Sequence, residues 1–413
     1  MQEPSYMIII PANEEDIKDP SVFIENLKKN AHVHLKSLQV DEERGLVADF
    51  EVDGKPYQAE INPTDVEIPE FVRPQHAFTK EEIERIDGTK TGLSVCMDYE
   101  GDSRVCFYDQ LRFINAMFPF PGILAVMDCP SEKLLSGKWV ALAANSSIMP
   151  APRYLFTVQA VSDEDGEVWL HTHGLKRCGL YELEILCSDK DKCNDHYKMI
   201  ETFACRMLES EEPIQPGEGV FLAQAGDEYL VCTAVDWKEA LKHYPDAKLG
   251  TEADREDEGH GEDTYVLMLY ESEEAENTGW YTPISNFDPY LNQNPMYMFS
   301  NEETERMSRL AIERIPYIKK AFANMECTII VKIGLPVDEK YKDSDLPEKE
   351  HIWFELKDIS DDLVVAELTQ EPYYVSGIKE GDVASYPVSS ITDWIIFTPD
   401  CRITPDDVYL LDK

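Results

Sequence analysis

The chain has 413 residues, of which 81 are Asp or Glu and 38 are Lys or Arg, so its formal net charge is −43. Such an acidic balance argues against an electropositive groove for DNA or RNA and against docking to an anionic membrane. Hydrophobic residues make up 43% of the sequence, which is enough for packed cores, and the length fits about two to three domains.

Residues 1–75 are predicted to form an N-terminal α+β unit. The apolar run 6–10 is typical of a short buried strand. Asp19 followed by Pro20 has the order of an N-cap and a first-turn proline, so a helix is expected from there to about residue 30. Three strands should follow, at 33–40, 46–52 and 57–61.

The central region, residues 76–324, alternates strands and helices too irregularly for a doubly wound sheet, and an α+β arrangement is expected. A capping box at 79–82 predicts a short helix, and a stripe of apolar residues predicts a second one over 102–117. Ser131 is expected to cap a third helix that runs through residue 142. Strands are expected at 93–98, 123–127, 154–160, 167–173, 229–235 and 265–270.

The acidity peaks in residues 209–278, which contain 20 acidic and 4 basic side chains. Its centre, 251–263, reads TEADREDEGHGED and has no apolar side chain larger than alanine. This segment is predicted to be a solvated insertion within a folded domain. It could also bind a divalent cation or attract a basic partner, although it does not fit the EF-hand pattern.

The last part of the chain, residues 325–413, is predicted to be a small β-rich domain. A long helix over 301–322, kinked at Pro316, should precede it. Its strands are expected at 327–333, 352–356, 363–368, 383–388 and 394–397. The fold class is therefore α+β and multi-domain, with mixed or antiparallel sheets, flanking helices and this β-rich C-terminal domain.

Several common catalytic motifs are missing from the sequence. It contains no GxxxxGK[ST] loop, no GxGxxG after a strand, no GxSxG elbow and no HExxH helix. The commonest nucleotide-dependent enzymes, serine hydrolases and zinc proteases are thus not indicated.

The most chemically suggestive segment is WLHTHGLKRCGLYELE, residues 169–184. In a strand, the period of two places His171 and His173 on one face, where two imidazoles can reach one metal ion. Cys178, Glu182 and Glu184 are close enough in sequence to complete a site. Zinc is the ion expected for such a mixed set of ligands.

A structural role is the alternative for the same segment. Gly174 and Gly179 would then turn the chain, Arg177 would pair with a nearby carboxylate, and the histidines would be half-buried hydrogen-bonding groups. The binding candidates here are Arg177, Glu182 and Glu184. A second HxH pair at residues 32–34 has no nearby cysteine or carboxylate partner in the sequence.

The C-terminal region carries a family likeness. A WFE strand at 353–355, an xPxxVxGxKxGD loop at 371–382 and an ITDW segment at 391–394 resemble the bacterial domain of unknown function numbered 2314, over about residues 325–398. The segment THGLKRCGLYELE at 172–184 is similar to the bacterial domain of unknown function numbered 4026. These resemblances imply architecture and a bacterial origin, but no activity or cofactor.

Four aromatic residues of the C-terminal motif have different expected roles. Trp353 and Trp394 are expected to fill the small core. Tyr373 and Tyr374 are equally compatible with the core and with an exposed recognition patch.

Two functional hypotheses follow. The first is a cytoplasmic, non-catalytic interaction module that binds a basic protein partner, since charge of one sign speeds association with an opposite surface. It needs no cofactor, nucleic acid or membrane. The alternative is a metal-dependent hydrolase centred on His171, His173 and Glu182, with zinc as its ion.

Overall fold

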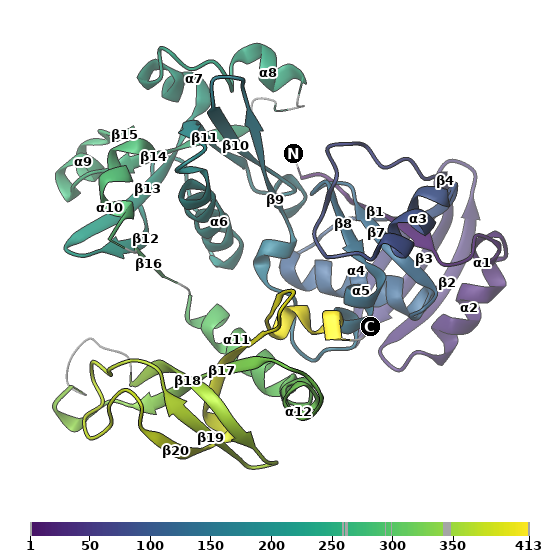
Figure 1. Cartoon of the computed structure of the whole chain (residues 1–413). Helices are drawn as coiled ribbons and strands as arrows, with labels where there is room; N and C mark the ends of the chain where they lie inside the picture. Colours follow the sequence, from purple (N-terminus) through teal and green to yellow (C-terminus); the bar gives the residue numbers. More distant parts are fainter. Residues whose placement is uncertain are drawn as a thin grey trace. The chain divides into compact units, whose positions relative to one another are not determined.

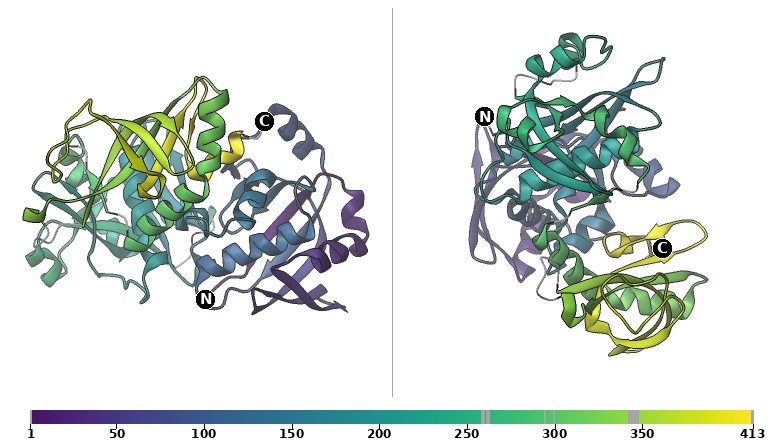
Figure 2. Two further views of the ribbon diagram at one scale, coloured as in Figure 1. Left: turned by 90° about the horizontal axis from the view of Figure 1, so that it is seen from below. Right: turned by 90° about the vertical axis from the view of Figure 1, so that its left-hand side faces the viewer.

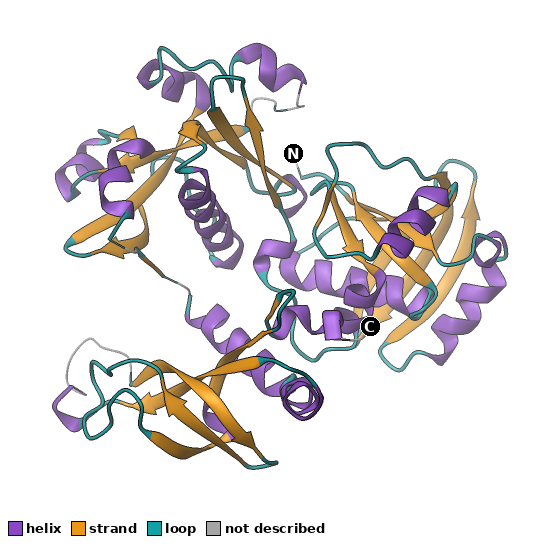
Figure 3. Cartoon of the chain, viewed as in Figure 1, coloured by secondary structure: helices purple, strands orange, loops and turns teal. Residues whose placement is uncertain are grey.

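The computed structural model describes residues 2–257, 260, 263–293, 295–298, 300–341 and 348–411. They form three β-sheets with flanking helices (Figure 1, Figure 3), which confirms the α+β prediction. The chain divides into two units, one of residues 1–145 and 150–300, the other of residues 146–149 and 301–413. The first unit contains two of the sheets and the second unit contains the third.

The first sheet has the strand order β2-β3-β4-β6-β1-β7-β8-β5 and is antiparallel except where β5 lies beside β8. Helix α4 packs against it, with Phe113 stacked on Phe50 at a ring-centroid distance of 3.8 Å. The left view of Figure 2 shows this sheet and its helices from below. The strands are β1 (Ser5–Pro11), β2 (Val33–Asp41), β3 (Gly45–Val52), β4 (Lys55–Asp65), β5 (Arg73–Pro74), β6 (Thr91–Met97), β7 (Ile123–Asp128) and β8 (Lys133–Ser136). The helices are α1 (Glu15–Lys18), α2 (Pro20–Lys29), α3 (Lys80–Gly88), α4 (Ser103–Met117) and α5 (Gly137–Ala144).

Short-range signals in the sequence, such as helix-capping residues, predicted most of these elements. Asp19 accepts a hydrogen bond from the backbone of Ser21 at the start of α2, and the capping box of Thr79 and Glu82 opens α3. The domain boundary expected at residue 75 falls inside the sheet, because β1 pairs with β6 on one side and β7 on the other. Those two partners come later in the chain than residue 75.

The helix predicted to begin at Ser131 is wrong. Residues 133–136 form strand β8, which pairs with β7, and α5 begins only at Gly137. Leu134 and Leu135 are both buried, so this strand is covered on both faces. A short run that is buried on both faces does not alternate, and its pattern cannot be told from that of a buried helix.

The second sheet has the order β16-β12-β13-β14-β11-β10-β9, with β15 on β14. It is mixed, since β11 and β14 run parallel while the other pairs are antiparallel. Its strands are β9 (Thr157–Ser162), β10 (Glu167–His173), β11 (Glu182–Asp189), β12 (Val220–Ala225), β13 (Glu228–Asp236), β14 (Thr264–Tyr270), β15 (Thr282–Pro283) and β16 (Met296–Tyr297). The helices are α6 (Cys193–Glu209), α7 (Trp237–Ala240), α8 (Glu252–Asp257), α9 (Glu273–Thr278) and α10 (Asp288–Leu291).

The third sheet, in the second unit, is antiparallel with the order β20-β19-β18-β17-β21-β22. The right view of Figure 2 shows how strongly its yellow-green strands curve. They are β17 (Thr328–Pro336), β18 (Lys349–Ile359), β19 (Leu363–Leu368), β20 (Val383–Pro387), β21 (Ile391–Phe397) and β22 (Arg402–Ile403). The expected long helix is two helices, α11 (Asn301–Glu313) and α12 (Ile315–Asn324), with Pro316 in the first turn of the second.

The core of this second unit depends on one of the two expected tryptophans. Trp394 is fully buried, and its indole N–H donates to the carbonyl of Ala311 at 3.0 Å, which ties β21 to α11. Trp353 is only half-buried and lies under the ammonium group of Lys332. Because α11 packs on this sheet, the helix that we assigned to the central region belongs to the C-terminal unit.

Within the described residues, no helix has both the length and the apolar character that crossing a bilayer requires.

Candidate metal centre

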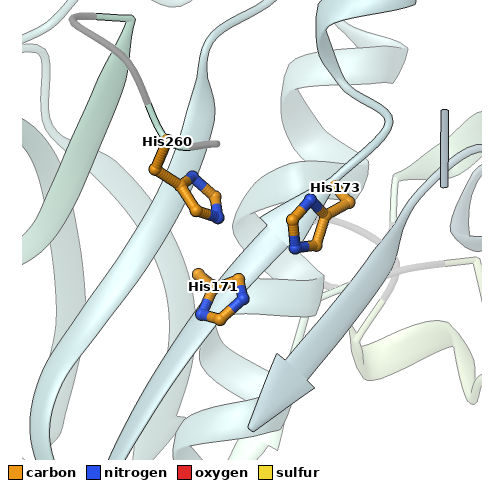
Figure 4. Close-up of side chains that lie close together, drawn as sticks. All are labelled: His171, His173 and His260. Atoms are coloured by element: carbon orange, nitrogen blue, oxygen red, sulfur yellow. The ribbon is translucent and has the colours of Figure 1, made fainter. Parts of the chain in front are cut away.

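Three histidine side chains converge beside strand β10. His171 and His173 project from the same face of the strand, and His260 comes from the segment that follows α8 (Figure 4). Their ring centroids are 5.0, 4.6 and 4.8 Å apart, an almost equilateral triangle. One nitrogen from each ring can be chosen so that all three lie within 4.8 Å of one another.

Five of the six nitrogens of these rings are buried and lack hydrogen bonds among the described residues. Both nitrogens of His171, both of His260 and Nε2 of His173 have no hydrogen-bond partner among the described residues. His171 is 0% exposed and His260 is 5% exposed. A buried polar group without a partner costs about 1–3 kcal/mol, so five such nitrogens in one place call for a ligand.

The surroundings keep the three imidazoles neutral. Burial lowers the pKa of His171 to about 2, with the two other histidines and Arg255 adding to the effect. Burial lowers the pKa of His260 to about 3, and burial together with Lys176 lowers that of His173 to about 4. Neutral imidazole is the form that binds a transition metal.

His260 is held in place by a buried ion pair. Its backbone N–H donates to the carbonyl of Arg255 at 2.8 Å, at the end of α8. The guanidinium of Arg255 pairs with Glu184 on β11 and donates to the carbonyl of Gly250 at 3.0 Å. Glu184 also accepts from the indole N–H of Trp169 at 3.1 Å, so the arginine is fixed against the sheet.

The prediction that residues 251–263 form a solvated insertion is therefore only partly right for the described part of this segment, which lies between β13 and β14 and exposes Glu252 and Asp263. Residues 252–257 are helical, and Arg255 and His260 are buried against the sheet. Arg255 lies 4.5 Å from the ring centroid of Trp237, which adds a cation–π contact. The acidic composition predicted exposure, but the side chains of Arg255 and His260 anchor the segment to the sheet.

The donor set suits zinc. Imidazole nitrogen binds Zn²⁺ at about 2.0–2.1 Å, so that two ligands of a tetrahedral ion lie about 3.4 Å apart. The spacing of up to 4.8 Å here would have to close by up to about 1.4 Å, through rotation of the rings. Three protein nitrogens leave one position of a tetrahedral shell for water or another ligand.

Comparison with known protein families places this centre within one of them. The N-terminal model of the protein of unknown function DUF4026 matches residues 5–150, and its C-terminal model matches residues 158–268. Together they span more than half of the chain. The chain belongs to the DUF4026 family.

The C-terminal unit matches DUF2314, described as an uncharacterised protein conserved in bacteria, over residues 313–403. Both family likenesses expected from the sequence are confirmed. No curated protein and no solved structure matches the chain. The three histidines all lie in the C-terminal part of DUF4026.

The other ligands expected from the sequence, Cys178, Glu182 and Glu184, lie outside the histidine cluster. Within the described part of the chain, no cysteine or carboxylate joins the three histidines. Cys178 is turned away toward the carbonyl of Gly174, and burial raises the pKa of its thiol to about 12. Glu182 accepts hydrogen bonds from the Thr172 hydroxyl at 2.6 Å and from the Gly174 backbone at 2.9 Å, so it holds the turn after β10.

Arg177 is in a buried ion pair between the two parts of DUF4026. It is 0% exposed, and its guanidinium meets both carboxylate oxygens of Asp128, at 2.5 and 2.8 Å. It also donates to the carbonyl of Leu155 at 2.6 Å. Arg177 therefore has the structural role, an ion pair with a carboxylate, that was the alternative to ligand binding. Its buried side chain has no access to a ligand.

The two tyrosines differ in exposure. Tyr373 is 77% exposed and Tyr374 is half-buried, and their backbone N–H groups each donate to the carboxylate of Glu350 at 2.8 Å. Glu350 thus fixes the loop that presents Tyr373. Its exposure leaves Tyr373 available as a recognition residue.

A serine, a histidine and an aspartate also line up in the DUF4026 region. Nδ1 of His196 is 2.7 Å from the Ser188 hydroxyl, and Nε2 is 2.9 Å from Asp288. Ser188 is 2% exposed, so its oxygen cannot meet a substrate. These contacts tie β11, α6 and α10 together rather than form a nucleophilic site.

Proposed function

We propose that this DUF4026 protein binds one zinc ion through His171, His173 and His260. The observation that carries the proposal is the set of five buried ring nitrogens without hydrogen-bond partners among the described residues. An ion at this place would satisfy one nitrogen of each ring. It would also join the segment that carries His260 to strand β10.

The three histidines support metal binding, and no reaction is assigned to them. A hydrolase would need a base beside the ion, and Glu182, the carboxylate expected for that role, is engaged by Thr172 and by the turn after β10. Burial of His171 and His260 also restricts access of a substrate to the centre. These features favour an ion that stabilises the fold or responds to metal supply.

Metal analysis tests the zinc site directly. Purified protein loaded with zinc and desalted is expected to retain one zinc per chain. His171→Ala/His173→Ala, which leaves one imidazole, and His260→Ala, which leaves two, should each lose it, because fewer than three protein ligands do not hold the ion tightly.

The chain offers a matched control in its other HxH pair. His32 is exposed and lies 2.9 Å from Asp53, and the variant His32→Ala/His34→Ala should retain the full zinc content. Zinc that survives in His171→Ala/His173→Ala, or wild-type protein that retains none, would contradict the proposal.

We also propose that the acidic surface of the protein recruits a basic protein partner. Support comes from α9, where the exposed Glu273 and Glu274 are followed closely by Trp280, whose side chain is 67% exposed. An exposed indole beside carboxylates can stack on a lysine or arginine of the partner. The carboxylates would raise the rate of encounter.

A salt-controlled pull-down tests this partner proposal. Immobilised protein is expected to retain a basic protein from a bacterial lysate at low salt and to release it at high salt, since exposed charges are screened. Trp280→Ala and Glu273→Gln/Glu274→Gln should each reduce retention several-fold. Retention that neither salt nor these variants change would rule out this surface.

A further inference from the structure

One nitrogen of the histidine cluster faces a carboxylate from the other part of DUF4026. Nδ1 of His173 lies 3.6 Å from Oε1 of Glu132, in the turn between β7 and β8. The Glu132 and His173 side chains are 23% and 12% exposed. Nε2 of His173, by contrast, is buried and has no partner among the described residues.

We infer that Glu132 is the outer-shell carboxylate of the zinc site and that it directs Nε2 of His173 toward the ion. A histidine ligand usually donates its second ring N–H to a carboxylate or carbonyl, which fixes the tautomer and the orientation of the ring. This inference rests on the proposed zinc site. It means that both parts of DUF4026 build the site, although all three ligands come from one of them.

The turn that carries Glu132 is fixed in several ways. The Ser131 hydroxyl donates to Asp128 at 2.5 Å, and Asp128 in turn pairs with Arg177. Glu132 has a left-handed backbone, with φ at +53°, and its other carboxylate oxygen accepts from the Gln159 side chain. A residue with this strained backbone conformation is maintained by its surroundings, which is common at functional sites.

The same turn also packs closely against the residue that follows His173. A Cβ atom on Gly174 would lie 3.0 Å from Cβ of Ser131 and 2.6 Å from the carbonyl oxygen of Leu155. Gly174 itself has φ at +112°. The close approach holds Glu132 beside His173 without requiring a flexible loop to close.

Zinc affinity of Glu132→Gln tests the inference. Competition with a chromophoric chelator is expected to show affinity about 10- to 100-fold weaker than wild type, with one zinc still bound at saturation. Substitution with Co²⁺ should give a shifted visible spectrum, because the His173 ring is no longer held. Glu164→Gln, which removes an exposed carboxylate from the turn between β9 and β10, should leave both unchanged.

A measurement on the metal-free protein gives a second readout. The ¹⁵N shifts of His173 are expected to show the proton on Nδ1 in wild type and a mixture of tautomers in Glu132→Gln. If wild type binds zinc and the variant matches it in affinity and tautomer, the role of Glu132 is refuted while the zinc site stands. If wild type binds no zinc, both proposals fail.

Discussion

Replacing Arg177 with methionine is expected to lower the free energy of unfolding by about 3–5 kcal/mol, because Asp128 would remain as a buried charge without its partner. Both side chains of this pair are 0% exposed. The guanidinium also lies 5.2 Å from the ring centroid of Phe107, so the pair packs against an aromatic ring. Water cannot replace the lost contacts.

Urea unfolding, followed by far-ultraviolet circular dichroism, measures this effect. The double variant Asp128→Asn/Arg177→Met should be less destabilised than Arg177→Met alone, since it removes the orphaned charge. Lys80→Met breaks an exposed ion pair to Glu84 and should change stability by less than about 1 kcal/mol. Equal losses for Arg177→Met and Lys80→Met would show that the buried pair is not a main contact between the two parts of DUF4026.

The sequence predicted elements whose signals are local. The capping box of α3 and the alternation of strands such as β3 rely on neighbours within a few residues, and both were placed correctly. The assignment failed at residues 133–136, where burial on both faces removes the alternation. The order in which strands pair depends on residues that are far apart in the chain. For this reason the domain boundary expected at residue 75 falls inside a sheet.

The sequence predicted only two of the three histidines of the site, because only these two are close together in the chain. The period of two placed His171 and His173 together, because both lie on one strand. His260 comes from a distant acidic segment, and its approach depends on the pairing of β11 with β14 and on the contact between Arg255 and Glu184. The one signal was that Arg255 and His260 interrupt an otherwise acidic run.

Two buried arginine pairs thus hold the segments that form the centre. Arg255 and Glu184 hold the segment that carries His260, and Arg177 and Asp128 hold the turn that carries Glu132. Neither arginine contributes to the metal shell. A centre that depends on such supports should be formed before the ion arrives, with only the rings moving on binding.

Zinc is expected to raise the stability of the folded protein strongly, because the metal-free form buries nitrogens that have no partners among the described residues. Free zinc at 1,000 times its dissociation constant adds about 4.1 kcal/mol if only the folded state binds it. Thermal unfolding with zinc and with chelator measures the gain. The gain should vanish in His171→Ala/His173→Ala and persist in His32→Ala/His34→Ala. A shift that survives in the first variant would place the bound ion elsewhere, among the surface carboxylates, and would separate the acidity of the chain from its metal centre.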